Sequence, residues 1–111
     1  MILHTSTNYD ILMIHLPSRL DSNSAQDAES DLKTLLPPSG SYVLFDCLEM
    51  GYISSAGIRV LLSATKSLMK SGKKVAFCSV HSHVKEVFEM GGFTRIFTIY
   101  DSQDTAVKRM K

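Results

Sequence analysis

Residues 42–78 decide the fold, and they read YVLFDCLEMGYISSAGIRVLLSATKSLMKSGKKVAFC. Residues 42–46 are a compact apolar run of strand length that ends in a carboxylate. After Ser54 or Ser55, apolar residues recur at intervals of three and four, which predicts an amphipathic helix. Residues 75–78 form a second apolar run. The stretch therefore predicts a strand, a crossover helix and a parallel strand, the repeating unit of an α/β sheet.

On the amino-terminal side of this unit, the sequence predicts a hairpin and a helix. Residues 2–5 and 9–16 read as strands, with a turn at residues 6–8 between them. Both faces of the second strand are apolar, so we expect it to be covered on both sides. Capping side chains at residues 22–24 precede a helical pattern that ends at the proline pair 37–38.

On the carboxyl-terminal side, the pattern continues with a short helix around residues 84–88, ended by the glycine pair 91–92. A strand over residues 96–100 and a last helix capped by Asp101 follow. The order β-β-α-β-α-β-α-β-α predicts an α/β fold. We expect one domain over residues 1–111, with a mixed, mostly parallel sheet, an antiparallel edge from the hairpin and about four helices.

Composition excludes several classes of protein. The 111 residues are 44% apolar and 21% charged, which is typical of a globular domain. The net charge is only +1 and the basic residues are scattered along the sequence, so the charge gives no support for binding of nucleic acid. The apolar runs are too short for a spanning helix or a signal peptide, so we expect a cytoplasmic protein with no membrane insertion. Cys47 and Cys78 are far apart in sequence and are expected to be buried thiols.

The residues also give little support for catalysis. His81 and His83 are two apart, which predicts different sides of a helix and lacks the spacing of a metal-binding pair. A nucleophile elbow needs glycine two residues before and after its serine, whereas Ser55 has Ile53 before it and only Gly57 after it. We therefore expect no enzyme activity, no cofactor and no metal.

Two adjacent hydroxyls, Ser54 and Ser55, mark the start of the helix in the central unit. Ligands and partners of α/β sheets tend to meet the carboxyl ends of strands and the helix starts that follow them. Serine is a favoured N-cap, so either residue could simply accept a hydrogen bond from a free backbone N–H group. A phosphoryl group there would instead place negative charge beside the positive end of the helix. The residues alone leave both interpretations open.

The same region carries a family resemblance. Residues 52–62, YISSAGIRVLL, with VLFD at 43–46 before them, resemble the signature of STAS domains, specifically the stand-alone anti-sigma factor antagonists of bacteria. Further similarities lie at residues 19–21 (RLD), 72–75 (GKKV), 91–93 (GGF) and 96–97 (IF). The resemblance covers nearly the whole chain.

This resemblance implies a partner switch. In that family the unmodified protein binds an anti-sigma factor that is also a serine kinase. Phosphorylation of the serine two residues before the glycine, here Ser55 before Gly57, ends the binding until a serine phosphatase removes the phosphate. Ser54 stands where much of the family has aspartate, and it is the alternative acceptor. By resemblance the partner interface includes Asp21, Ser54, Ser55, Gly57 and Arg59.

The family fold has a second use, which leads to a different expectation. STAS domains also serve as accessory subunits of transporters and as modules of sensor assemblies. In such a protein the serine at the helix start would be only a cap. The sequence favours the switch and keeps the accessory subunit as the alternative.

Overall fold

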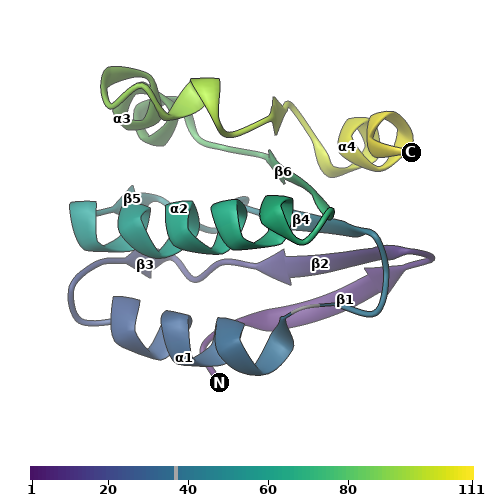
Figure 1. Ribbon diagram of the computed structural model, residues 1–111. Coiled ribbons are helices and arrows are strands. Elements are labelled where there is room, and N and C mark those ends of the chain that lie inside the picture. The colour runs from purple at the N-terminus through teal and green to yellow at the C-terminus, as the bar shows by residue number, and fades with distance from the viewer. Residues whose placement is uncertain (37) are drawn as a thin grey trace.

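Figure 1 shows the computed structural model of the protein, which describes residues 1–36 and 38–111. In chain order the elements are β1 (His4–Asn8), β2 (Ile11–His15), β3 (Arg19–Leu20), α1 (Ala25–Leu35), β4 (Tyr42–Asp46), β5 (Tyr52–Ile53), α2 (Ser55–Lys70), β6 (Lys74–Cys78), α3 (Ser82–Met90), the 3-10 turn η1 (Phe93–Arg95), β7 (Ile99–Tyr100) and α4 (Gln103–Met110). The predicted strand, helix and strand of the central unit correspond to β4, α2 and β6.

The main sheet has the strand order β1-β2-β4-β6-β7. β1 runs antiparallel to β2, and every other neighbouring pair is parallel. A parallel pair needs a crossover, and α1 and α2 supply the crossovers from β2 to β4 and from β4 to β6. The predicted α/β fold, with a mixed sheet and an antiparallel hairpin edge, is confirmed.

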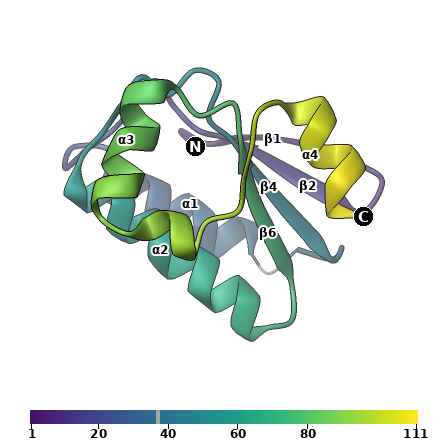
Figure 2. The ribbon, with the colours of Figure 1, turned by 90° about the horizontal axis from the view of Figure 1, so that it is seen from above.

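Helices cover both faces of this sheet, and two hydrophobic cores result. Figure 2 shows α1, α2 and α3 on one side of the sheet and α4 on the other. Phe45 and Phe77 point into the larger core, where their rings stack with centroids 5.0 Å apart. Leu44 and Ala76, one position earlier in the same strands, point into the smaller core below α4. β2 contributes to both cores, which confirms that it is covered on both faces.

A second, two-stranded sheet was not predicted. β3 pairs with β5 in parallel, so that Arg19 lies beside Tyr52 and Leu20 beside Ile53. Residues 47–53 show no clear period and contain Gly51, which from the sequence alone indicates a loop. Two residues are too short for a detectable period, and the pairing depends on the burial of Leu20 and Ile53 in the larger core.

The hairpin turn lies later than predicted. β1 continues through Ser6 and Thr7 to Asn8, and the turn falls on Tyr9 and Asp10, with a φ of 55° at Tyr9. The polar residues that indicated a turn instead form an exposed edge strand. Threonine fits such a strand well, because its branched side chain suits a pleated surface.

Three predicted boundaries also differ. The strand predicted at 96–100 is only Ile99–Tyr100, because Phe97 turns into the larger core after η1. The cap of α4 is Ser102, whose Oγ accepts from Thr105 N at 3.2 Å, and not Asp101. α1 ends at Leu35, and the predicted stop at Pro37 lies outside the described residues.

Candidate functional site

Ser54 caps helix α2. Its backbone is extended, with φ −100° and ψ 174°, and its Oγ accepts a hydrogen bond from Gly57 N at 3.4 Å. Ser54 N donates to Leu20 O at 2.9 Å, which ties the start of the helix to β3. The half-buried Ser54 therefore caps α2 with its side chain and ties the helix to β3 with its backbone.

Ser55 is the first residue of α2, and it is exposed. In the described part of the chain, its hydroxyl makes no hydrogen bond to another protein group. No acidic residue occupies the first turn of α2. The backbone N–H groups at a helix start carry a partial positive charge, so an anionic group on Ser55 would meet a favourable field. The cap and the exposed hydroxyl thus belong to two different serines.

Asp21 follows β3 and organises the start of α1. Its Oδ1 accepts from Asn23 N at 3.0 Å and from Ser24 N at 3.3 Å, and Arg19 Nε donates to its Oδ2 at 3.3 Å. Desolvation by burial raises the pKa of Asp21, but the two backbone N–H groups and the Arg19 guanidinium outweigh it and hold that pKa below its usual value. The side chain of Ser24, from the predicted capping group, makes no cap bond to α1.

Gly57 is the point of closest approach between α2 and β3. A Cβ at this position would lie 2.4 Å from Leu20 O, 2.9 Å from Leu20 Cγ and 3.0 Å from Ile53 Cγ1. Gly57 is buried at this contact. The lack of a side chain is therefore what allows the helix start to lie against the small sheet.

Charged and aromatic side chains flank the two serines. Arg19 stacks on the ring of Tyr52, with its guanidinium carbon 4.3 Å from the ring centroid, and both side chains are exposed. Arg59 is also exposed, one turn after Ser55 in α2. The structure thus joins the end of β3, with Asp21, to the start of α2.

Two histidines hold the loop that precedes β5. Nε2 of His81 lies 2.7 Å from Leu48 O, and Nε2 of His83 contacts Gly51 O. Their rings stack with centroids 5.9 Å apart, so the prediction that they lie on different sides of a helix is wrong. His81 is the N-cap of α3 and has an extended backbone, which turns its ring toward that of His83. Within residues 1–36 and 38–111, no group of three His, Cys, Asp or Glu side chains could hold a metal ion.

A polar network lies on the sheet face that carries α4. His15 Nδ1 is 2.8 Å from Asp46 Oδ2, and its Nε2 is 2.9 Å from Ser6 Oγ. Asp46 Oδ1 also accepts from Leu48 N at 3.1 Å. These residues come from three strands, so no sequence spacing could have revealed their contact. His4 lies opposite His15 in the hairpin, but Ser6 and Asp46 satisfy the two ring nitrogens of His15.

Cys47 and Cys78 are both fully buried, as predicted. Cys47 N donates to Cys78 O at 3.0 Å, which places the residue after β4 beside the last residue of β6. Burial, and then the nearby Asp46 carboxylate, raises the pKa of Cys78 to about 11. Burial also raises the pKa of Cys47. Both thiols are held in the unreactive protonated form.

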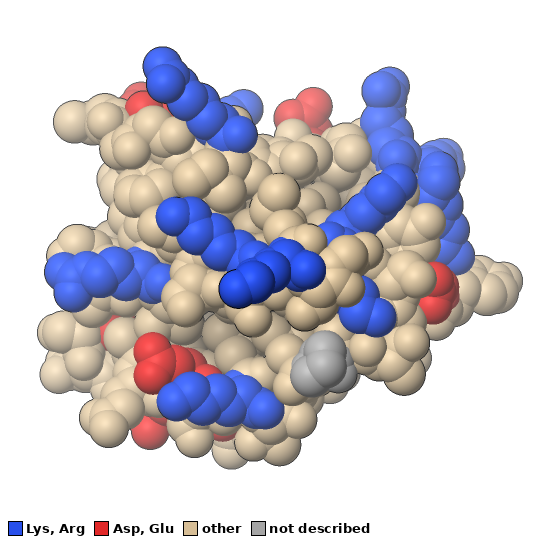
Figure 3. All heavy atoms as spheres, in the orientation of Figure 1, with Lys and Arg blue, Asp and Glu red and all other residues tan. Residues whose placement is uncertain are grey.

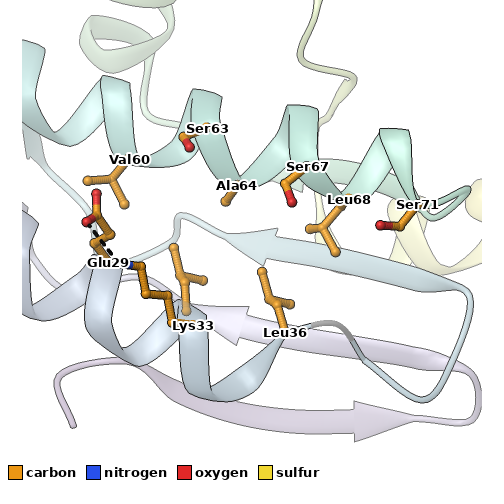
Figure 4. A pocket seen from close by; sticks show the side chains of 10 residues that line it. Glu29, Lys33, Leu36, Val60, Ser63, Ala64, Ser67, Leu68 and Ser71 are labelled. Atoms are coloured by element: carbon orange, nitrogen blue, oxygen red, sulfur yellow. Dashed lines mark ion pairs between the residues drawn. The ribbon is translucent and has the colours of Figure 1, made fainter.

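A groove of about 470 Å³ runs between α1 and α2 (Figure 4). Leu32 and Leu36 line the α1 side, and the wall on α2 begins at Val60, just over one turn after Ser55. Glu29 and Lys33 form an ion pair of 3.7 Å at its rim. The α2 wall of the groove carries no charged side chain. This groove was not predicted from the sequence.

Among the described residues, no helix is both long enough and apolar enough to span a bilayer.

The two serines are expected to differ in their effect on stability. Replacing Ser54 with alanine removes the cap of α2 and should lower the free energy of unfolding by about 1 kcal/mol. Replacing Ser55 with alanine removes only an exposed hydroxyl and should change it by less than about 0.5 kcal/mol. Urea denaturation of both variants checks this. A larger loss for Ser55→Ala than for Ser54→Ala would reverse the assignment of the cap.

Asp21 is expected to make stability depend on pH. Because the pKa of Asp21 is lower in the folded protein than its usual 3.8, the stabilisation is fully present above that value and is lost as pH falls through the folded pKa. Between about pH 7 and pH 3, Asp21→Asn should therefore lose less unfolding free energy than the parent protein. Denaturation at both pH values gives this difference. Equal losses would mean that the contacts of Asp21 do not favour its charged form.

Comparisons with known proteins agree with this geometry. The model of the STAS domain family matches residues 3–106. BtrV of Bordetella bronchiseptica, which is assigned as an anti-sigma factor antagonist, is 33% identical over 101 residues, covering 91% of this chain and 87% of that protein. The fold of an anti-sigma-factor antagonist (STAS) domain protein from Planctomyces limnophilus matches with a TM-score of 0.85 at 19% identity, covering 98% of this chain and 97% of that one. The phosphorylated form of the Bacillus cell fate determinant SpoIIAA matches with a TM-score of 0.73 at 13% identity, covering 98% and 99%. The chain therefore belongs to the STAS domain family and, within it, to the anti-sigma factor antagonists.

Proposed function

We propose that this protein binds an anti-sigma factor with serine kinase activity, and that phosphorylation of Ser55 ends the binding. The observation that carries the proposal is the division of roles at the start of α2. Ser54 is half-buried, and its Oγ caps α2 by accepting a hydrogen bond from Gly57 N, whereas Ser55 is exposed. A kinase needs a hydroxyl that it can reach, and Ser55 offers one.

The geometry favours Ser55 over Ser54 as the acceptor. A phosphoryl group on Ser54 would use the oxygen that caps the helix and would have to fit against β3. On Ser55 it would extend into solvent beside the free N–H groups of the first turn. Arg59 follows Ser55 by four residues, a spacing at which helix side chains are neighbours. Its positive charge would stabilise the phosphate in the free protein.

The proposed partner surface consists of Asp21, Ser54, Ser55 and Arg59, with Gly57 below it. Gly57 is buried, so it contributes through the close packing of α2 on β3 and not through exposed surface. In the unmodified protein this surface presents only one free hydroxyl at its centre. A partner could close over this hydroxyl without desolvating the charge of a phosphate, which is the costly event in forming an interface.

Two relatives support the proposal. BtrV, at 33% identity, is assigned as an anti-sigma factor antagonist. SpoIIAA, a structural neighbour, has been solved in both phosphorylated and unphosphorylated forms. A serine phosphatase would complete the cycle by removing the phosphate from an exposed Ser55.

The test uses the anti-sigma factor kinase encoded by the same organism. The protein, Ser55→Ala and Ser54→Ala are each incubated with this kinase and ATP, and the modified residue is mapped by mass spectrometry. We expect one phosphate on Ser55 in the parent and in Ser54→Ala, and none in Ser55→Ala. Modification of Ser54 alone would move the switch by one residue. Stable binding without any phosphorylation would indicate a constitutive accessory subunit.

A further inference from the structure

β6 has one edge that is only half paired. Along its whole length β6 pairs with β4, from Lys74 to Cys78, but β7 pairs only with Phe77 and Cys78. Just before β7, Thr98 O still accepts from Phe77 N at 2.8 Å. Residues 96–97 lie off the sheet, since no backbone hydrogen bond in the described chain joins Val75 to residues 96–98. The first half of β6 therefore lies open on the side away from β4.

The open edge presents unpaired main-chain groups. Lys74 N donates to Ser41 O, on the β4 side, at 2.9 Å, and Phe77 N donates to the β7 side. Backbone N–H groups alternate between the two edges along a strand, so the N–H and C=O of Val75 face the open side. Unpaired groups of this kind are a template for one more strand.

A groove of about 290 Å³ lies at the same place. Met69 and Lys73 line it from the α2 side of the sheet, whereas Arg109 and Met110 line it from α4 on the other side. Val75 and Ile96 lie between them. Because residues from both helix layers border the groove, it sits at the edge of the sheet, in the position that an additional strand would take.

The charge around this groove is positive. Lys73, Lys74 and Arg109 line it, and none of its lining residues is acidic. Lys73 Nζ donates to Gly40 O at 2.9 Å, on the β4 side, so the charges of Lys74 and Arg109 are those that remain for a ligand at the open edge. Figure 3 shows Lys and Arg side chains gathered on the right of the view, over α4 and the end of α2. Basic residues that are scattered in the sequence are thus brought together by the fold.

We propose that this groove binds an extended, acidic segment of a partner protein, which adds a strand to the open edge of β6. Main-chain hydrogen bonds to Val75 would supply affinity, and the basic rim would select glutamate and aspartate side chains. A nucleic acid or a lipid headgroup could use the positive charge but not the strand edge. The two features together therefore favour a peptide.

This surface is separate from the proposed phosphorylation site. Ser55 begins α2 and Lys70 ends it, so the 16-residue helix separates the two sites by about 22 Å. An acidic segment and an anti-sigma factor could therefore be bound at the same time. The inference does not rest on the switch at Ser55, and either could fail without the other.

The test uses a fluorescein-labelled hexapeptide of alternating glutamate and valine, capped at both ends. Fluorescence anisotropy should show saturable binding with a Kd below about 1 mM, and NMR should place the shifted amide signals at Val75 and Ala76. Arg109→Glu should weaken binding at least tenfold. Lys33→Glu, the same charge change at the rim of the groove between α1 and α2, should leave it unchanged. Equal weakening by both variants would overturn the proposal.

A second pair of tests removes the main-chain hydrogen bonds, first from the peptide and then from the protein. The same hexapeptide, N-methylated at alternate backbone nitrogens, keeps its charge but cannot form a strand ladder. We expect its affinity to fall at least tenfold. Val75→Pro, which removes the N–H that faces the groove, should have a similar effect while circular dichroism stays unchanged. Equal affinity of the two peptides, or no saturation with either, would exclude strand addition.

Discussion

Phosphorylation of Ser55 is expected to weaken binding of the anti-sigma factor at least tenfold, a loss of about 1.4 kcal/mol or more. The phosphoryl group brings a charge of about −1.5 to −2 at neutral pH, which partner binding would have to desolvate. The free protein should keep its fold, because the phosphate sits beside the exposed N–H groups of the first turn of α2. Calorimetric titration of the stoichiometrically phosphorylated protein against the kinase measures the change.

The matched controls are the two serine variants. Unphosphorylated Ser55→Ala should bind the partner as the parent does and should not lose affinity after treatment with the kinase and ATP. Ser54→Ala should respond to phosphorylation like the parent. Ser55→Glu carries only one negative charge and is expected to give a smaller effect than the phosphate. Identical affinities of the phosphorylated and unmodified forms would rule out the switch.

Gly57→Ala is expected to lower the free energy of unfolding by about 1 to 3 kcal/mol. The new methyl group would lie 2.4 Å from Leu20 O, a backbone atom that cannot rotate away. Overpacking of this kind costs about 1 to 3 kcal/mol. Moving α2 away would strain the hydrogen bond from Ser54 N to Leu20 O, worth about 1 kcal/mol more. The gain in helix propensity from glycine to alanine, about 1 kcal/mol, offsets only part of this loss.

Gly51→Ala is the control for this substitution. A Cβ at Gly51 meets no atom within 4 Å, and the residue is not in a left-handed conformation. Its stability should therefore stay within about 0.5 kcal/mol of the parent. Denaturant unfolding compares the two variants directly. A Gly57→Ala protein that is as stable as Gly51→Ala would mean that α2 does not press on β3 as closely as described.

The fold was predictable where the pattern of apolar residues is long. α2 spans 16 residues, and its period of 3.6 is clear in the sequence. β4 and β6 have five residues each and were recognised as compact apolar runs on either side of that helix. β3, β5 and β7 each have two residues, which is too few for any period. β3 and β5 form because Leu20 and Ile53 are buried together in the larger core. β7 is short because the segment after η1 pairs only with the end of β6.

The location of the candidate site was predictable from the sequence, but the roles of its two serines were not. The sequence located the serine pair at a helix start, but it could not decide which hydroxyl is the cap. That distinction depends on the extended backbone of Ser54, which begins the helix one residue later. The closeness of Gly57 to Leu20 O was also hidden, since it joins residues from β3 and α2 across a long stretch of chain. Contacts between distant segments require the folded structure.

The separate roles of Ser54 and Ser55 bear on how this protein can evolve. A mutation at Ser54 or Gly57 is first a folding mutation, because it disturbs the cap or the packing of α2 on β3. A mutation at the exposed Ser55 leaves that framework intact. On the proposed function, a single codon change at position 55 could therefore free a lineage from kinase control and keep a working binding domain. Selection can thus adjust regulation and stability independently at neighbouring positions.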